Sequence, residues 1–305
     1  MFYYWAYGLT IRSEMYFPEL MPMDYTESAD VSLYFGKVPI HRDENVDEAN
    51  RNIYINNHCF KLVVPDVAAY WAEDGINIII EKTEPVDERL VRLFCLSNVF
   101  AAILNQRKIF PLHAAAIKIE DYLVLICGHS GVGKSTLVAS LLSKGYKIFS
   151  DDVCVPFISP DGKVYMQSSY PMMKFWKDTL NVFPKLGEPN IQLRSDYDKY
   201  GIFFHDQFDR KALTPSVVFF LEKSSETKDV YFRDIKGIEL FQKLESNAYR
   251  GEYLGGLDLK QSHFELFTSL ANQLKGYVLE RPKDMNTIVK LSNQAEEIIR
   301  NELEQ

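Results

Sequence analysis

Apolar and polar residues alternate at the start of the chain. Every second position from Tyr3 to Ile11 is aromatic or aliphatic, a spacing typical of a β-strand. Prolines stand around or between the later strand-like runs, as expected for residues that cannot donate to a β-ladder. These runs cover residues 31–35, 53–55, 60–64 and 76–80, with a turn or strand extension at 66–70. We therefore expect a small β-rich module over residues 1–88.

The apolar period changes after residue 86. Between residues 87 and 106, Leu90, Leu93, Phe94 and Ala101 share one face of a helix. Two strand-like runs, 112–119 and 122–127, then meet at Glu120–Asp121. A second domain over residues 89–305 is therefore expected to begin with this helix.

A strand–loop–helix–strand unit follows. A glycine-rich turn leads into a predicted helix at 134–143, which Gly145 closes, and a strand is expected at 146–149. Further strands are predicted at 217–221 and 229–232, and helices at 237–249, 264–273 and 285–302. The fold class is α/β, because strands and helices alternate.

Composition excludes several classes of protein. The chain has 305 residues, of which 47% are hydrophobic and 25% charged, so it is neither disordered, collagenous nor a coiled coil. Acidic residues outnumber basic ones by 42 to 34, giving a net charge of −8. This balance argues against broad binding to nucleic acid or to anionic membranes.

Neither membrane insertion nor secretion is expected. No run approaches about 18 uninterrupted apolar residues, and the aromatic N-terminus lacks the basic leader of a signal peptide. The four cysteines are widely spaced without a CxxC pair, so we expect free thiols rather than disulfides or a zinc site. A cytoplasmic location is predicted.

The strongest motif is a phosphate-binding loop. Residues 128–135 read Gly-His-Ser-Gly-Val-Gly-Lys-Ser and match GxxxxGK[ST] between a predicted strand and a predicted helix. Glycines let successive backbone N–H groups surround an anion, and the helix N-terminus favours negative charge. Lys134 can reach the β- and γ-phosphates, and the Ser135 hydroxyl can ligate Mg²⁺. The residues expected to contact nucleotide here are Gly128, His129, Ser130, Gly131, Val132, Gly133, Lys134, Ser135 and Thr136.

Two adjacent acids follow the next strand. In a strand–helix–strand unit both strands run the same way, so Asp151 and Asp152 should lie beside the loop. One could hold Mg²⁺ and the other could accept a proton from an attacking hydroxyl. The simpler interpretation is that both contact metal-bound water or cap a turn.

Two more residues are candidates for phosphate contact. If Glu120–Asp121 is a two-residue hairpin turn, His113 faces Gly128 and its ring lies beside the loop. A buried structural histidine is the alternative. Arg250 follows a predicted helix and could touch phosphate, although a solvated cation at a helix C-terminus is the simpler interpretation.

Taken together, these residues resemble HPr kinase/phosphorylase. The resemblance rests on Leu112-His113-Ala114, the loop, and residues 145–152, with His113 21 positions before Lys134 and Asp152 18 after it. It implies the fold of the HPr kinase and PEP carboxykinase group. It also implies that His113, Lys134 and Asp152 are active-site residues, with Asp152 as the proton acceptor. Ser135, with Asp151, would hold Mg²⁺.

A closer resemblance is to HPr-kinase-related serine kinases of peptide-modification clusters, including kinases of lasso peptide precursors. It draws on residues 112–115, 170–171, 174–176, 249–250 and 281–284 and on the aromatic N-terminal strand. The chain departs from HPr kinase itself at His129 and Thr136, where that family has acids, and at Lys177, where its later glutamate-containing metal motif would stand. These departures favour a one-way kinase over a bifunctional enzyme.

The sequence therefore predicts a phosphotransferase that uses ATP and Mg²⁺ and acts on a serine of a peptide or protein. A GTPase and a transporter ATPase are disfavoured, because NKxD and LSGGQ-like motifs are absent. Three alternatives stay open: a small-molecule kinase, HPr kinase/phosphorylase proper, and a non-catalytic nucleotide sensor. The phosphate donor, the acceptor and any assembly into homo-oligomers are left undetermined.

Overall fold

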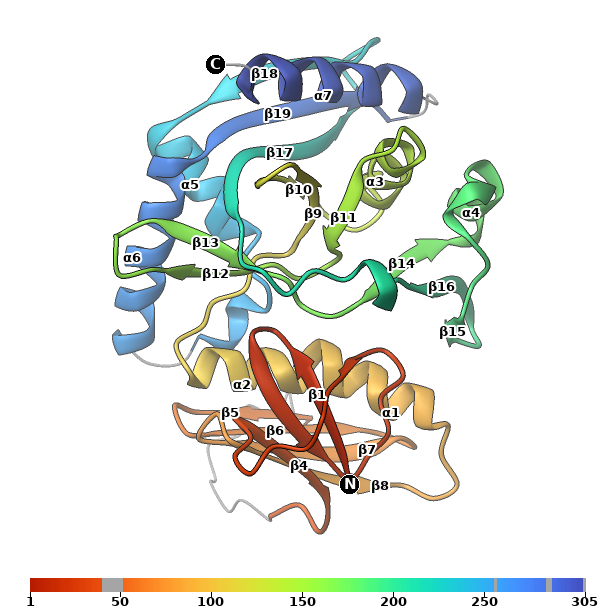
Figure 1. Cartoon of the computed structure of the whole chain (residues 1–305), viewed down its shortest axis with the longest axis vertical. Coiled ribbons are helices and arrows are strands. Elements are labelled where there is room, and N and C mark those ends of the chain that lie inside the picture. Colours follow the sequence, from red (N-terminus) through yellow and green to blue (C-terminus); the bar gives the residue numbers. More distant parts are fainter. Residues whose placement is uncertain (40–51, 255–256, 284–286, 304–305) are drawn as a thin grey trace. The chain divides into compact units, whose positions relative to one another are not determined.

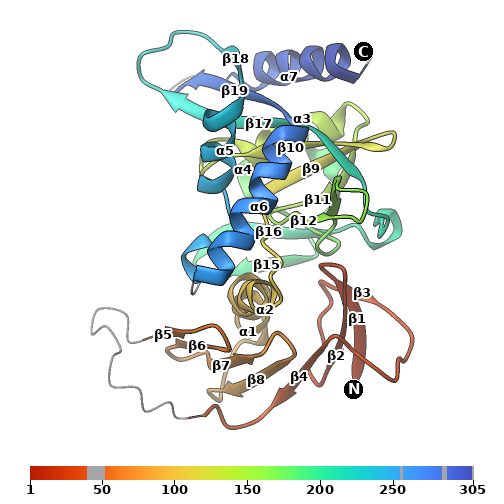
Figure 2. The same cartoon turned by 90° about the vertical axis from the view of Figure 1, so that its left-hand side faces the viewer.

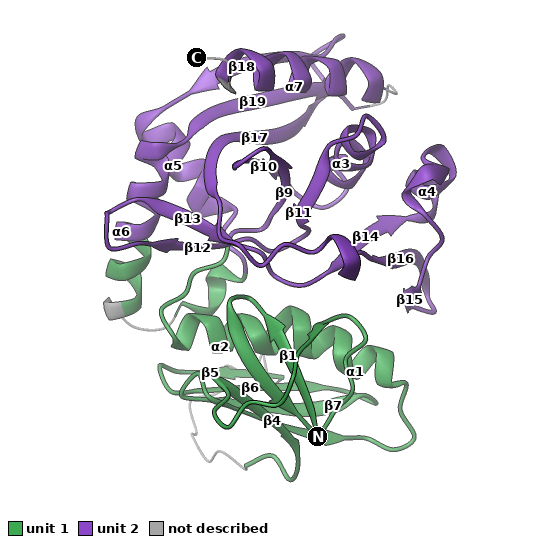
Figure 3. Ribbon diagram, viewed as in Figure 1, with its two compact units in different colours: residues 1–111, 250–264 green, residues 112–249, 265–305 purple. Residues whose placement is uncertain are grey.

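The computed structural model describes residues 1–39, 52–254, 257–283 and 287–303, and the chain forms two compact units (Figures 1 and 3). Unit 1 comprises residues 1–111 and 250–264, and unit 2 comprises 112–249 and 265–305. The first division falls at 111/112, beyond the boundary expected at 88/89, because the helical segment after residue 87 belongs to unit 1. The assignment of domains as 1–88 and 89–305 stays a prediction.

Unit 1 is built on an eight-stranded sheet with the order β3-β1-β2-β4-β8-β7-β6-β5. In chain order the strands are β1 (Phe2–Ala6), β2 (Leu9–Ser13), β3 (Met21–Pro22), β4 (Val31–Phe35), β5 (Ile53–Ile55), β6 (Cys59–Val64), β7 (Ala68–Glu73) and β8 (Asn77–Lys82). β4 runs parallel to both β2 and β8, whereas the other neighbouring strands are antiparallel. The β-rich character expected of this region is confirmed.

The alternating stretch at the N-terminus, expected to be strand-like, is a hairpin of two strands, β1 and β2. Tyr7 and Gly8 both have positive φ and form a two-residue turn that pairs Ala6 with Leu9. Tyr4 therefore shares a face with Ile11, while Tyr3 lies opposite Arg12 on the other face. Alternation alone could not show the reversal, because aromatic residues continue through the turn.

One helical segment covers the buried face of this sheet. It consists of α1 (Glu88–Phe94), a π-helical turn (Cys95–Val99) and α2 (Phe100–Gln106), and Asp87 caps its N-terminus. Tyr7 and Tyr70 donate hydrogen bonds to the carbonyls of Leu96 and Val91 respectively. The helix expected at 87–106 is confirmed, with the π turn as a local irregularity.

Unit 2 is built on a six-stranded mixed sheet with the order β11-β9-β10-β17-β19-β18 (Figure 1). Its strands are β9 (Ala114–Ile119), β10 (Tyr122–Cys127), β11 (Lys147–Ser150), β17 (Thr214–Ser224), β18 (Tyr231–Ile235) and β19 (Lys275–Pro282). β10, β17 and β19 are parallel, whereas β9 and β18 are antiparallel to their neighbours. The α/β class predicted from the sequence is confirmed.

Helices lie on both faces of this sheet (Figures 1 and 2). α3 (Lys134–Ser143) and α7 (Ile288–Leu303) share one hydrophobic core with the strands. On the other face, α5 (Gly237–Ser246) packs against β19, where a Cβ at Gly276 would meet Leu240. α6 (Leu257–Gln273) ends in this unit, and the expected helix start at Met285 lies outside the described residues.

Two small sheets complete unit 2. β12 (Val155–Ile158) pairs with β13 (Val164–Gln167), and a second sheet has the order β14-β16-β15. These three strands are β14 (Met172–Trp176), β15 (Ile191–Arg194) and β16 (Tyr197–Phe203), and α4 (Lys177–Val182) directly follows β14. Short 3₁₀ turns occur at Pro184–Leu186, His205–Gln207 and, in unit 1, Gly251–Tyr253. None of the helices in the described residues has the length and apolar character that crossing a bilayer requires.

Candidate functional site

The glycine-rich loop joins β10 to the N-terminus of α3, as the sequence predicts. Gly128, Gly131 and Gly133 all have positive φ, at 150°, 80° and 111°. Gly128 is also tightly enclosed, because a Cβ there would lie 2.8 Å from Cγ1 of Val132 and 3.1 Å from the carbonyl oxygen of Leu221. The loop thus has the local conformation for which glycine is needed, with Lys134 and Ser135 opening the helix.

β11 brings two acids to the same edge of the sheet. β10 and β11 are both antiparallel to β9, which lies between them, so their carboxyl ends open on one side. Asp151 and Asp152 follow β11 directly. Asp152 has φ 69°, a left-handed conformation that aspartate tolerates better than most residues. The predicted proximity of the acids to the loop is confirmed, although the two strands are not neighbours.

His113 is placed by backbone pairing on both sides. The β9–β10 hairpin keeps the predicted register as far as Ala114 opposite Cys127, so His113 lies next to the loop. The His113 N–H donates to the carbonyl of Asn247, and Leu112 forms bridges to Cys154 and Ala248. The ring of Tyr249 lies 5.8 Å from the imidazole, centroid to centroid.

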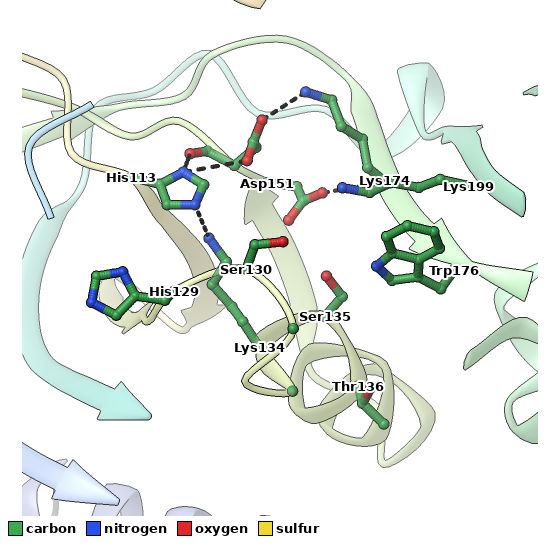
Figure 4. A pocket seen from close by; sticks show the side chains of 13 residues that line it. His113, His129, Ser130, Lys134, Ser135, Thr136, Asp151, Lys174, Trp176 and Lys199 are labelled. Atoms are coloured by element: carbon green, nitrogen blue, oxygen red, sulfur yellow. Dashed lines mark hydrogen bonds and ion pairs between the residues drawn. The ribbon is translucent and has the colours of Figure 1, made fainter. Parts of the chain in front are cut away.

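A chain of polar contacts joins the loop lysine to the second acid (Figure 4). The Nζ of Lys134 lies 3.0 Å from Nε2 of His113. The Nδ1 of His113 lies 3.0 Å from the carbonyl oxygen and 3.3 Å from Oδ1 of Asp152. Because an ammonium can only donate, Nε2 accepts and Nδ1 carries the proton of a neutral ring. Burial and the ammonium of Lys134 lower the pKa of His113 to about 4, which agrees with that tautomer.

Lys174 of β14 binds both aspartates. Its ammonium lies 2.7 Å from Oδ2 of Asp152, and its main-chain N–H donates to Oδ2 of Asp151 at 2.7 Å. Burial favours the neutral carboxyl, but the ammonium of Lys174, with His113 and Lys134, holds the pKa of Asp152 far below its usual range. For Asp151, burial and the charge of Asp152 outweigh the nearby lysines and raise its pKa.

These residues surround a cavity of about 310 Å³ in unit 2. Most of the predicted site residues line it, together with three that the sequence did not single out as site residues, Lys174, Trp176 and Lys199. The lining residues are His113, His129, Ser130, Gly131, Gly133, Lys134, Ser135, Thr136, Asp151, Asp152, Lys174, Trp176 and Lys199. The loop, both acids and the histidine are therefore brought together as expected.

Three predicted residues are not among those that line the cavity. Gly128 and Val132 belong to the loop without lining the cavity. Val132 is buried, and its carbonyl accepts a hydrogen bond from Nε of Arg281 at 3.0 Å. Arg250 belongs to unit 1, where it has φ 54° and lies 3.4 Å from the carboxylate of Glu252. A nucleotide contact by Arg250 stays a prediction.

The three additional lining residues differ in how far the sequence could indicate them. Lys174 interrupts an apolar run, Met172–Trp176, which indicates a buried lysine in need of a partner. Lys199 carries no comparable signal, because only its pairing with Trp176 across the ladder brings it to the cavity.

The polar groups fit a magnesium-bound phosphate. The Ser135 hydroxyl, in the first turn of α3, and the Asp151 carboxylate line the same cavity and carry the hard oxygen atoms that Mg²⁺ prefers. Mg²⁺ commonly takes one or two such ligands and completes its shell with phosphate oxygens and water. Within the described ranges, no group of three or more His, Cys, Asp or Glu residues is arranged to hold a metal ion.

Comparison with known proteins finds similarity to the family that the motifs resemble. No protein-family profile matches the sequence. The chain is 27% identical over 127 residues to HPr kinase/phosphorylase of Lactobacillus gasseri and 26% identical over 127 residues to that of Lactobacillus johnsonii. Each match covers 38% of this chain and 38% of the relative, so it spans under two-fifths of the relatives' length. The expected resemblance to HPr kinase/phosphorylase is thereby confirmed.

A solved structure gives only a weak match. The HPr(Ser) kinase/phosphatase of Coxiella burnetii is 12% identical, with a TM-score of 0.31, over 63% of this chain and 91% of that one.

Proposed function

We propose that the protein is a kinase that transfers the γ-phosphoryl group of ATP, with Mg²⁺, to a serine hydroxyl of a peptide or protein. One observation carries the proposal: Lys134 of the glycine-rich loop and the carboxylate of Asp152 meet through His113 in one cavity. A phosphate-binding group and a hydroxyl-binding group are thus held side by side. Resemblance to HPr kinase/phosphorylase supports the same class of reaction.

In the proposed reaction the serine oxygen attacks the γ-phosphorus. A bond forms between that oxygen and phosphorus, the bond to the β–γ bridging oxygen breaks, and ADP leaves. The hydroxyl proton passes to Asp152. The transition state of such transfers is loose, so the hydroxyl needs orientation more than a strong base. The low pKa of Asp152 keeps the carboxylate ionised near neutral pH, so it can accept a hydrogen bond from the hydroxyl and orient it, although it makes Asp152 a weak base.

The other groups would act by position and charge. Lys134 would leave Nε2 of His113 and bind phosphate oxygens, while backbone N–H groups of the loop surround them. Once Lys134 has left, Nε2 of His113 would take up a proton from solvent and donate to the γ-phosphate, while Nδ1–H stays with Asp152. Ser135 and Asp151 would hold Mg²⁺, which offsets the charge of the phosphates when bound.

The substrate class follows from the resemblance to peptide-modifying kinases, and a lasso peptide precursor is the first acceptor to test. The proposal places the protein in the cytoplasm, where ATP and Mg²⁺ are available, and it involves neither nucleic acid nor membrane. Self-assembly is compatible with this function and is not required by it. A small-molecule acceptor, HPr itself, or nucleotide sensing without transfer are the competing functions.

Intact-mass measurement would test the proposal. The protein with Mg²⁺ and ATP would be offered a lasso precursor peptide ending in serine, HPr and free serine in separate reactions. We expect a gain of about 80 Da, one phosphate, on the peptide. Asp152→Asn is the matched control, because asparagine tolerates the left-handed backbone but cannot take a proton. Transfer to HPr or free serine would replace the substrate, and nucleotide binding without transfer to any acceptor would favour the sensor.

A further inference from the structure

Lys199 is the one lysine of the cavity whose ammonium contacts no acidic or polar group within the described residues. It lies on β16 opposite Trp176 of β14, and its Nζ is 5.7 Å from the centroid of the Trp176 ring. Lys134 and Lys174, by contrast, are bound to His113 and Asp152. An ammonium has three donors, and in Lys199 they are open to a ligand.

The strand end that carries Lys199 borders the first turn of α3. Trp176 immediately precedes α4, and Oγ1 of Thr179 in α4 lies 3.3 Å from Oγ1 of Thr136 in α3. Thr136 and Ser135 line the same cavity as Trp176 and Lys199 (Figure 4). Lys199 therefore lies on the wall that faces the N-terminus of a helix, where phosphate groups bind.

The charged groups that act on Lys199 include both acids. Burial lowers its pKa, and its strongest charge interaction is the attraction of Asp152, followed by the repulsion of Lys174. A half-buried ammonium without a bound partner is unfavourable, and an anion placed between Lys199 and the loop would relieve that cost. Because Asp152 would receive the acceptor hydroxyl, the anion nearest to both groups is the phosphoryl group that is transferred.

We infer that Lys199 is a second phosphate-binding lysine, which contacts the terminal phosphoryl group of the nucleotide from the side opposite Lys134. This inference rests on the proposed function and adds a residue to it. Trp176 is a positioning residue, because its ring face holds the ammonium over the cavity. During transfer Lys199 would balance charge on the same oxygens that Lys134 binds from the loop.

Nucleotide binding tests the inference without knowledge of the acceptor. Affinities for Mg²⁺·ADP and for the non-hydrolysable Mg²⁺·β,γ-imido-ATP would be measured by calorimetry on the full chain. We expect Lys199→Met to weaken the ATP analogue about tenfold or more, the usual effect of losing one charge-assisted hydrogen bond, while ADP changes less than twofold. Lys199→Arg should recover most of the lost affinity for the analogue. The affinity of Trp176→Phe should lie between those of Lys199→Met and Lys199→Arg.

Lys163→Met is the matched control, since Lys163 is exposed in the turn between β12 and β13 of the same unit. It should bind both nucleotides like the wild type. Equal weakening of ADP and analogue by Lys199→Met, or no weakening of either, would overturn the inference while leaving the kinase proposal in place. If neither nucleotide is weakened but the KM for the acceptor rises, Lys199 would instead bind an acidic group of the acceptor. If the wild type binds neither nucleotide, the proposed function itself fails.

Discussion

The ammonium of Lys174 lies 2.7 Å from the carboxylate of Asp152, and the Lys174 side chain is only 7% exposed. The ring of Tyr170 lies under the same ammonium, 5.7 Å from centroid to Nζ. Burial works against a charged lysine, but the carboxylate outweighs it and raises the pKa of Lys174. Each member of the pair therefore keeps the other ionised despite the burial of Lys174.

Removing Lys174 should destabilise the fold as well as the reaction. Lys174→Met leaves the carboxylate of Asp152 without its main partner, and breaking a buried pair usually costs about 3–5 kcal/mol. Asp152 is partly exposed, so we expect a loss of about 2–4 kcal/mol in the free energy of unfolding, measured by urea denaturation. The pKa of Asp152 should also rise.

A double variant separates the pair from simple packing. If the stranded carboxylate is the cause, Lys174→Met with Asp152→Asn should recover a large part of the stability lost by Lys174→Met alone. Additive losses in the two single variants would contradict the ion-pair explanation. Lys163→Met, at an exposed turn, controls for the loss of a lysine as such.

The pH dependence of stability should contain a contribution from His113. Its folded pKa of about 4 lies below the usual value near 6.5, so the unfolded chain binds this proton more readily. Stability from this group is complete above about pH 6.5 and falls as the pH drops toward 4. Between pH 7 and pH 5 we expect a loss of about 1–2 kcal/mol, discounted for partial exposure of the ring.

His113→Gln is the variant that removes this titration. Unfolding free energies at pH 7 and pH 5 would be compared for the two proteins, and the wild type should lose about 1–2 kcal/mol more. The two acids act in opposite directions: the lowered pKa of Asp152 adds a further loss of stability in strong acid, whereas the raised pKa of Asp151 favours the folded state as the pH falls. An identical pH slope in both proteins would show that His113 has an ordinary pKa.

The parts of the site that depend on local contacts could be predicted from the sequence. The two-residue turn at Glu120–Asp121 fixes the register of β9 against β10, and this register places His113 beside the loop. Helix α3 starts and ends as expected, because the glycine-rich loop and Gly145 mark its limits. Most residues of the candidate site could thus be predicted from the loop motif and its neighbouring strands.

Contacts between distant segments could not be predicted in this way. β9 lies between β10 and β11, an order that no local period encodes. Lys199 reaches the cavity because β16 pairs with β14 across the intervening residues 177–196, and hydropathy says nothing of that pairing. Residues 250–264 likewise join unit 1 through long-range packing, such as the hydrogen bond from Tyr253 to Asn98.

Two glycines of the loop should respond differently to alanine. Gly131 has φ 80° but open space where a Cβ would stand, so Gly131→Ala adds only left-handed strain of about 1–2 kcal/mol. At Gly128 the same methyl group would overlap Val132 and the backbone of Leu221. We expect Gly128→Ala to lower the free energy of unfolding by about 1–3 kcal/mol more than Gly131→Ala does. This difference is the usual penalty of overpacking. Equal effects in urea denaturation would show that the enclosure of Gly128 is unimportant.

A buried ion pair in unit 1 gives a prediction independent of the site. The Nε of Arg92 lies 2.8 Å and 3.1 Å from the two carboxylate oxygens of Glu19, and both side chains are less than 10% exposed. Arg92→Leu should cost about 3–5 kcal/mol in unfolding free energy, because it strands the Glu19 carboxylate in the core. Combining it with Glu19→Leu should restore much of that loss, since two packed apolar residues often replace a buried pair without penalty. A double variant as unstable as Arg92→Leu alone would mean that the shape of the pair, rather than its charge, holds the helical segment against the sheet.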